Sequence, residues 1–186
     1  KATGLTRQSI PGLMTVNNIE ELEKNNDFSG IDTIVHCAWP RPLKERLIDS
    51  DDTEKLFEYH FTKPLRDCLS LAKILKSKGT ENAKLILVGS TFALPGRHSW
   101  QFPMYSLSKS VIPNLVKILS LELAPTNHRI FGVMFDVLDG GMNSAMPKMA
   151  KISAQDRYPS GKIPSLDEAA DDLAWLVENN RNLLSG

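Results

Sequence analysis

The chain has 186 residues, and 22 Lys and Arg balance 22 Asp and Glu, so the formal net charge at pH 7 is zero. This length suits one domain with a sizeable core, and the balanced charge gives no basis for a nucleic-acid or anionic membrane partner. We find no apolar run near the roughly 20 residues that span a bilayer, and no signal peptide. The two cysteines, Cys37 and Cys68, lack metal-ligand spacing. We therefore expect a reduced, cytoplasmic protein without a metal site, whose partner is a small molecule.

Hydrophobic periodicity and turn residues divide the chain into alternating strands and helices. Such alternation is typical of an α/β fold with a parallel sheet. Strands are expected over residues 1–7, 14–16, 31–37, 85–88 and 130–135, and helices over residues 19–26, 51–78, 103–123 and 165–177.

Two prolines interrupt the long helices of this pattern. Proline has no N–H, so Pro64 leaves the carbonyl of His60 without its helical partner, and Pro113 does the same to the carbonyl of Lys109. We expect a break near Pro64 and a bend just past Lys109. The last helix is expected to begin with a capping box formed by Ser165 and Glu168.

The stretch from Leu85 to Lys109 carries the clearest chemical signal. Its apolar strand ends at two hydroxyl residues, Ser90 and Thr91, and Tyr105 and Lys109 follow one helical turn apart on the same face. A nearby ammonium favours phenolate and lowers a phenol pKa from its usual value of about 10. Tyr105 could then act as a general acid or base, while Ser90 or Thr91 holds a substrate oxygen.

This arrangement resembles the short-chain dehydrogenase/reductase family, whose signature is a Ser, sometimes a Thr, after the fifth strand and a Tyr-x-x-x-Lys further along. The resemblance implies a Rossmann-type, doubly wound parallel sheet in three α/β/α layers that binds NAD(P). It makes Tyr105 the acid/base and lets Lys109 also touch the nicotinamide ribose. Counting along the family pattern favours Thr91 at the catalytic Ser position and leaves Ser90 open.

The family's glycine-rich phosphate loop is missing from the chain. We therefore expect residues 1–186 to form a single NAD(P)-binding domain that is incomplete at both ends; the alternative is a naturally reduced protein that never binds a dinucleotide. Arg7 ends the first strand where the family discriminates between cofactors, and an Arg there pairs with a 2′-phosphate. NADP is therefore expected, with NAD possible.

The resemblance also places two other strand ends along the cofactor. After the strand over 130–135, Asp139-Gly140 replaces the family's Pro-Gly, Ser144 stands at its Thr, and residues 142–162 suit a mobile lid. The cofactor contacts implied at the end of the strand over residues 31–37 are His36, Cys37, Ala38 and Trp39. Those implied after the strand over residues 130–135 are Asp139, Gly140, Met142 and Ser144.

His60 falls where the family has its catalytic Asn. That Asn is thought to support a helix kink whose carbonyl holds a proton-relay water, a role that the carbonyl of His60 could take because of Pro64. The alternative is a core or subunit-contact histidine.

The resemblance implies NAD(P)-dependent carbonyl reduction or alcohol oxidation on a small molecule, by a homodimer or homotetramer. Two other functions stay open. A redox-neutral sugar-nucleotide epimerase or dehydratase is suggested by the His-Cys-Ala sequence at a strand end, and a non-catalytic binding protein of the same fold is suggested by the missing glycine loop.

Overall fold

A computed structural model of the protein describes residues 5–6, 14–15, 19–24, 30–44, 46–94 and 102–179. Its central sheet has three parallel strands in the order β3–β4–β5, and two short strands pair in parallel as a second sheet. Helical segments connect the strands of the central sheet, as parallel pairing requires. The strands are β1 (Leu5–Thr6), β2 (Met14–Thr15), β3 (Ile31–His36), β4 (Gly79–Ser90) and β5 (Arg129–Phe135).

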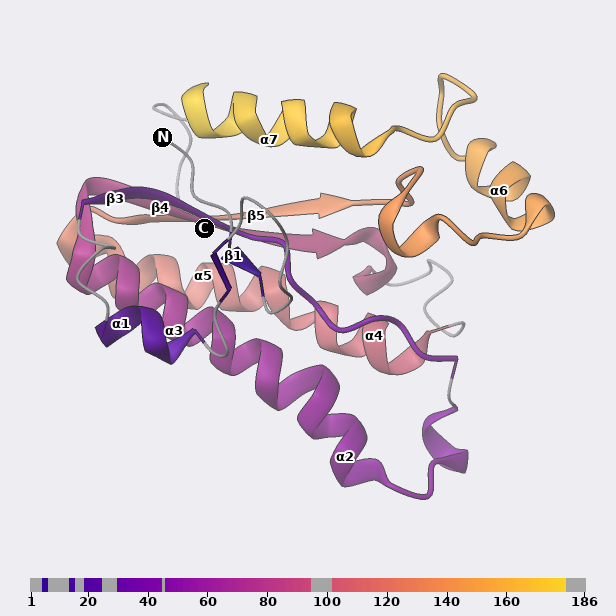
Figure 1. Ribbon diagram of the computed structural model, residues 1–186, viewed down its shortest axis with the longest axis horizontal. Helices are drawn as coiled ribbons and strands as arrows, with labels where there is room; N and C mark the ends of the chain where they lie inside the picture. The colour runs from indigo at the N-terminus through magenta and orange to yellow at the C-terminus, as the bar shows by residue number, and fades with distance from the viewer. Residues whose placement is uncertain are drawn as a thin grey trace.

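The central sheet is covered on both faces (Figure 1). Helix α7 (Leu166–Asn179) lies over one face, and α3 (Lys63–Lys78) and α5 (Val111–Leu123) lie over the other. Leu85, Ile86 and Leu87 in β4 are all at most 1% exposed, which a strand buried on both faces requires. The three-layer α/β/α arrangement implied by the family resemblance is confirmed.

The main core lies between the sheet and the two helices α3 and α5. It joins Leu75 of α3, Leu85 of β4, Ile112 of α5 and Ile130 of β5, each at most 1% exposed. Leu85 and Ile130 are also direct partners in the β4–β5 ladder. This packing holds α3, α5 and the middle strand as one unit.

Both predicted helix breaks are confirmed. Helix α2 (Thr53–Phe57) passes into a π-helical turn, η3 (Glu58–Thr62), directly before α3, whose second residue is Pro64. The wider turn suits a site where the proline cannot donate to the carbonyl four residues earlier. Helix α4 (Pro103–Lys109) is followed by Ser110 as its C-cap, and α5 starts at Val111, two residues before Pro113.

The remaining described elements are short. None of the helices in the described ranges is long and apolar enough to cross a membrane. The elements are α1 (Glu20–Lys24), η2 (Leu47–Asp49), η4 (Thr91–Ala93), η6 (Ala124–Thr126), η7 (Gly141–Asn143) and α6 (Lys148–Gln155).

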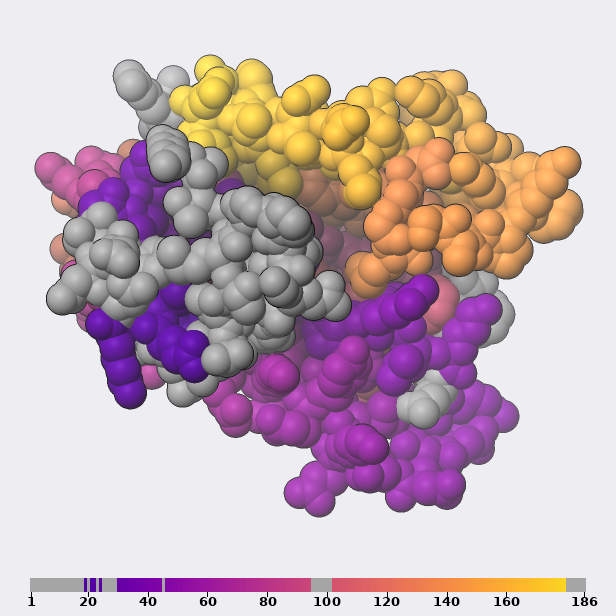
Figure 2. All heavy atoms as spheres, viewed as in Figure 1, coloured from indigo at the N-terminus to yellow at the C-terminus, as the bar shows by residue number. Residues whose placement is uncertain are grey.

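The segment predicted as a lid is attached to the chain that follows β5. Arg157 forms a half-buried ion pair with Asp136 at 3.3 Å, and the hydroxyl of Tyr158 donates to the carbonyl of Val137. Val137 also packs in a small apolar cluster with Ala154 of α6. In the space-filling view this segment and α7 form one continuous layer on the side away from α2 (Figure 2).

The predicted capping box at the start of α7 is confirmed. The backbone N–H of Ser165 donates to Glu168 Oε2 at 2.7 Å, and the backbone N–H of Glu168 donates to Ser165 Oγ at 3.1 Å. Two backbone donors that the helix itself cannot satisfy are thereby bonded.

Replacing Ser165 with Ala should lower the free energy of unfolding by about 1 kcal/mol, because the Glu168 N–H loses its acceptor. Urea unfolding followed by circular dichroism measures this change. Ser153→Ala, at an exposed position within α6, is the matched control and should change stability by less than about 0.5 kcal/mol. Equal effects of the two substitutions would contradict the assigned role of Ser165.

Candidate active site

Ser90, Tyr105 and Lys109 come together at the carboxyl end of β4. Ser90 is the last residue of this strand, η4 follows it directly, and α4 packs against η4. Pro103 starts α4 at a position where a missing N–H costs little. Tyr105 and Lys109 then lie one turn apart and are both buried, at 8% and 3% exposure.

The phenol of Tyr105 lies near enough to the side chain of Ser90 for this hydroxyl to influence its pKa. Burial raises the pKa of Tyr105 above its ordinary value, and the hydroxyl of Ser90 acts in the opposite direction but is the smaller effect. Ser90 Oγ accepts from the backbone N–H of Phe92 at 3.3 Å, which helps to fix its orientation. The phenol is therefore protonated at neutral pH.

The neighbouring hydroxyl, that of Thr91, does not take this position. Its Oγ1 is buried and has no hydrogen-bond partner within the described part of the chain. Successive residues at a strand end point in different directions, so Ser90 and Thr91 cannot both face Tyr105 in the same way. The structure thus pairs Tyr105 with Ser90, whereas the sequence pattern had favoured Thr91.

The buried ammonium of Lys109 contacts a backbone carbonyl and an aromatic ring. Lys109 Nζ donates to the carbonyl of Val88 at 2.6 Å and lies 4.2 Å from the ring centroid of Trp39. Its distance to the ring centroid of Tyr105 is 6.0 Å. Burial lowers the pKa of Lys109 from 10.5 to about 8.

The expected lowering of the Tyr105 pKa by Lys109 is not seen in this arrangement. The ammonium is directed at Val88, and burial of the phenol is the larger influence on its pKa, which is raised. Sequence spacing places the two side chains on one face of α4, but it does not determine where the ammonium points.

His60 lies in the π-helical turn and is fully buried, at 0% exposure. Its ring packs edge-on against Tyr59, with centroids 4.8 Å apart, and η3 contacts α4. This position agrees with a core histidine in a segment that packs against α4. The proposed relay through its carbonyl stays a prediction.

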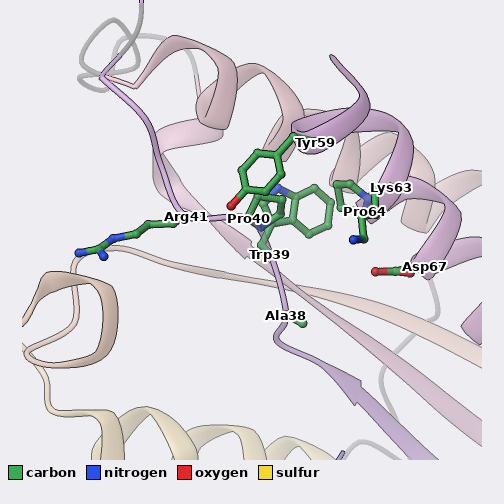
Figure 3. A pocket seen from close by; sticks show the side chains of 8 residues that line it. All are labelled: Ala38, Trp39, Pro40, Arg41, Tyr59, Lys63, Pro64 and Asp67. Carbon is green, nitrogen blue, oxygen red and sulfur yellow. The ribbon is translucent and has the colours of Figure 1, made fainter. Parts of the chain in front are cut away.

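The residues after β3 lie beside this site. His36 ends the strand and is buried, Cys37 is exposed, and the rings of His36 and Trp39 have centroids 6.3 Å apart. Ala38 and Trp39 line a pocket of about 250 Å³ (Figure 3). The other lining residues come from the same loop and from the helical segment across it: Pro40, Arg41, Tyr59, Lys63, Pro64 and Asp67. The side chain of Arg41 extends away from the others (Figure 3).

The turn after β5 is built on Gly140. This glycine has φ +139°, and a Cβ atom there would meet the side chain of Leu166 at 2.9 Å. Asp139 pairs with Lys151 at 2.8 Å, and its N–H donates to the carbonyl of Pro164. Met142 and Ser144, the other implied contacts, are both exposed.

Arg7 lies outside the described residues. No group of three or more His, Cys, Asp or Glu that could hold a metal ion occurs within the described ranges. Sequence reasoning missed two participants, the carbonyl of Val88 and the hydroxyl of Ser108, which accepts from Trp39 Nε1 at 3.1 Å. A backbone carbonyl has no sequence signal, but Ser108 stands one residue before Lys109 on the same helix.

Comparison with known proteins gives a consistent assignment. A family model described as enoyl-(acyl carrier protein) reductase matches residues 17–186. L-xylulose reductase of Mesocricetus auratus is 25% identical over 138 residues, which cover 72% of this chain and 56% of that protein. The chain spans only 34% and 56% of the lengths of the two curated relatives that it matches.

Solved structures share the fold. A short-chain dehydrogenase/reductase of Brucella melitensis superposes with a TM-score of 0.77 at 20% identity, covering 96% of this chain and 74% of that one. The angucycline C-6 ketoreductase LanV with bound NADP gives a TM-score of 0.70 at 14% identity, covering 89% of this chain and 62% of that one.

Replacing Ser90 with Ala should raise the pKa of Tyr105 further, since the influence of the Ser90 hydroxyl, which lowers it, is lost. Ultraviolet absorbance of the phenolate during a pH titration measures this value, and a Tyr105→Phe chain identifies the signal. Thr91→Val, which removes the neighbouring hydroxyl at nearly equal volume, should leave it unchanged. A larger effect of Thr91→Val would show that the wrong hydroxyl has been paired with Tyr105.

Proposed function

Because the chain belongs to the short-chain dehydrogenase/reductase family, we propose that it is an NADP(H)-dependent oxidoreductase that reduces a carbonyl group or oxidises an alcohol group of a small molecule. The observation that carries the proposal is the placement of Ser90, Tyr105 and the buried ammonium of Lys109 together at the carboxyl end of β4. Acid catalysis at a carbonyl oxygen needs a positioned proton donor and a second group that holds the oxygen. These three side chains supply that set.

The protonation state of Tyr105 suits it to act as the acid in carbonyl reduction. Its raised pKa keeps the proton on the phenol oxygen at neutral pH, where it can be donated to a carbonyl oxygen as negative charge develops there. In the reverse reaction, alcohol oxidation, the same group would accept the proton as phenolate. Ser90 would hold the same oxygen through its hydroxyl.

The charge of Lys109 supports the proton transfer. A cation near Tyr105 stabilises the phenolate that remains after the proton has left, and it does so strongly where water is excluded. Lys109 is 3% exposed and lies on the same helical face as Tyr105. The ammonium therefore acts on the product state of the transfer more than on the resting phenol.

The donor chemistry of the site fits a nicotinamide ribose. An ammonium has three N–H groups, and Lys109 uses one of them on Val88, which leaves donors for ribose hydroxyls. Bound NADPH would supply the hydride. We assign Lys109 and the residues at two strand ends to its binding, namely His36, Cys37, Ala38, Trp39, Asp139, Gly140, Met142 and Ser144.

Two arguments support NADP over NAD. Arg7 offers a guanidinium for a 2′-phosphate at the position where the family discriminates between the two cofactors. LanV, which shares the fold, was solved with bound NADP. We assign Arg7 to the 2′-phosphate.

We further propose a homodimer or homotetramer in the cytoplasm. Ile118 and Leu121 on α5 are 54% and 70% exposed, and burial of such side chains favours association. Cys37 and Cys68 are both free, which fits a reducing compartment.

Replacing Tyr105 with Phe should lower turnover at least about 100-fold, because the proton donor is lost, and should leave affinity for NADPH within about twofold. Fluorescence titration of the full-length protein with NADPH and NADH gives the affinities, and NADPH oxidation with a panel of aldehydes and ketones gives turnover. Undiminished turnover in the Tyr105→Phe chain would contradict the assigned acid. Failure to bind either dinucleotide would favour a non-catalytic protein.

A further inference from the structure

The indole of Trp39 is fixed against the helix that carries Lys109. Trp39 Nε1 donates to Ser108 Oγ at 3.1 Å, and the Ser108 hydroxyl donates to the carbonyl of Tyr105 at 2.9 Å. Pro40, the next residue, restricts the backbone of Trp39 to extended conformations. The ring is therefore held from both sides, by its own chain and by α4.

This fixed ring lies over the charge of Lys109, 4.2 Å from Nζ to the ring centroid. The negative face of an indole attracts a cation more strongly than the face of any other aromatic side chain. On the other side, Nζ donates to the carbonyl of Val88. Lys109 thus lies between a carbonyl of β4 and the side chain that follows β3.

The other titratable groups near Lys109 do little to stabilise its positive charge. They are the thiols of Cys37 after β3 and Cys68 on α3, and the phenol of Tyr105 on α4 itself. Desolvation raises the pKa of each of these groups, to about 12 for Cys68, and it does so for Cys37 although this residue stays partly accessible, so all three are neutral at pH 7. Among the ion pairs of the described ranges, none includes Lys109.

We propose that Trp39 is a positioning residue for Lys109, whose indole face keeps the buried ammonium charged and directed at the carbonyl of Val88. The assignment follows from the geometry alone; its bearing on turnover rests on the proposed function, in which Lys109 must be charged. Trp39 thereby has a role separate from any contact that it makes with a cofactor.

The test is a direct measurement of the Lys109 pKa in the full-length chain by NMR of isotopically labelled lysine side chains, with Lys109→Met identifying the signal. Trp39→Leu should lower the pKa by about half a pH unit, a threefold change in the acid dissociation constant. Trp39→Phe, which keeps a weaker aromatic face, should lower it less. Trp175→Leu is the matched control, because Trp175 is 61% exposed on α7, and should not change it.

Circular dichroism establishes that each variant folds. Ser108→Ala, which removes the acceptor of the indole N–H, tests the same claim should Trp39→Leu fail to fold, and should lower the Lys109 pKa by a smaller amount. An unchanged Lys109 pKa in the folded variants overturns the proposal.

The pH profile of kcat/KM connects the result to turnover. In Trp39→Leu, the decline of kcat/KM with rising pH should move to lower pH by the same amount as the Lys109 pKa. A merely structural role for Trp39 would lower kcat/KM by the same factor at every pH. Absence of turnover in the wild-type chain would count against the proposed function, while the NMR result would still decide the role of Trp39.

Discussion

The ammonium of Lys109 is buried without a carboxylate partner in the described part of the chain, and the rest of the site depends on how it is accommodated. Burial of a charge is unfavourable, which is why the pKa of Lys109 falls to about 8. A methionine could fill similar space without this penalty. The fold nevertheless keeps a cation beside Tyr105, and the proposed proton transfer supplies a reason for it.

Three segments far apart in sequence must meet to hold this charge. Val88 comes from β4, Trp39 follows β3, and Lys109 comes from α4. Neighbouring parallel strands end at the same edge of a sheet, so the fold itself brings the first two together. The packing of α4 against η4 then brings Tyr105 to the same edge. A chemical site at this edge follows from the topology of the sheet.

Local rules explain what the sequence predicted correctly. The breaks near Pro64 and Pro113 follow from the missing N–H of proline, and the capping box of Ser165 and Glu168 follows from residue type and spacing. The helical period likewise put Tyr105 and Lys109 on one buried face.

The unpredicted features depend on tertiary contacts. A shift of one residue decides whether Ser90 or Thr91 faces Tyr105, and a count along the chain does not fix this register. The contact of Trp39 with α4 joins residues 69 positions apart. The direction of the shift in the Tyr105 pKa depends on burial, which outweighs the pairing with Lys109 expected from spacing.

The most direct test of the central claim compares the unfolding free energy of Lys109→Met with that of the wild type across pH, with exposed Lys117→Met as control. Because the pKa of Lys109 is lower in the folded chain, at about 8 against 10.5, charged Lys109 destabilises the fold below pH 8, and this loss disappears as pH rises to 10.5. The account predicts that Lys109→Met is more stable at pH 7 by about 3 kcal/mol, with the difference vanishing at high pH. A Lys109→Met chain that is less stable at every pH would contradict it and make Lys109 a structural residue.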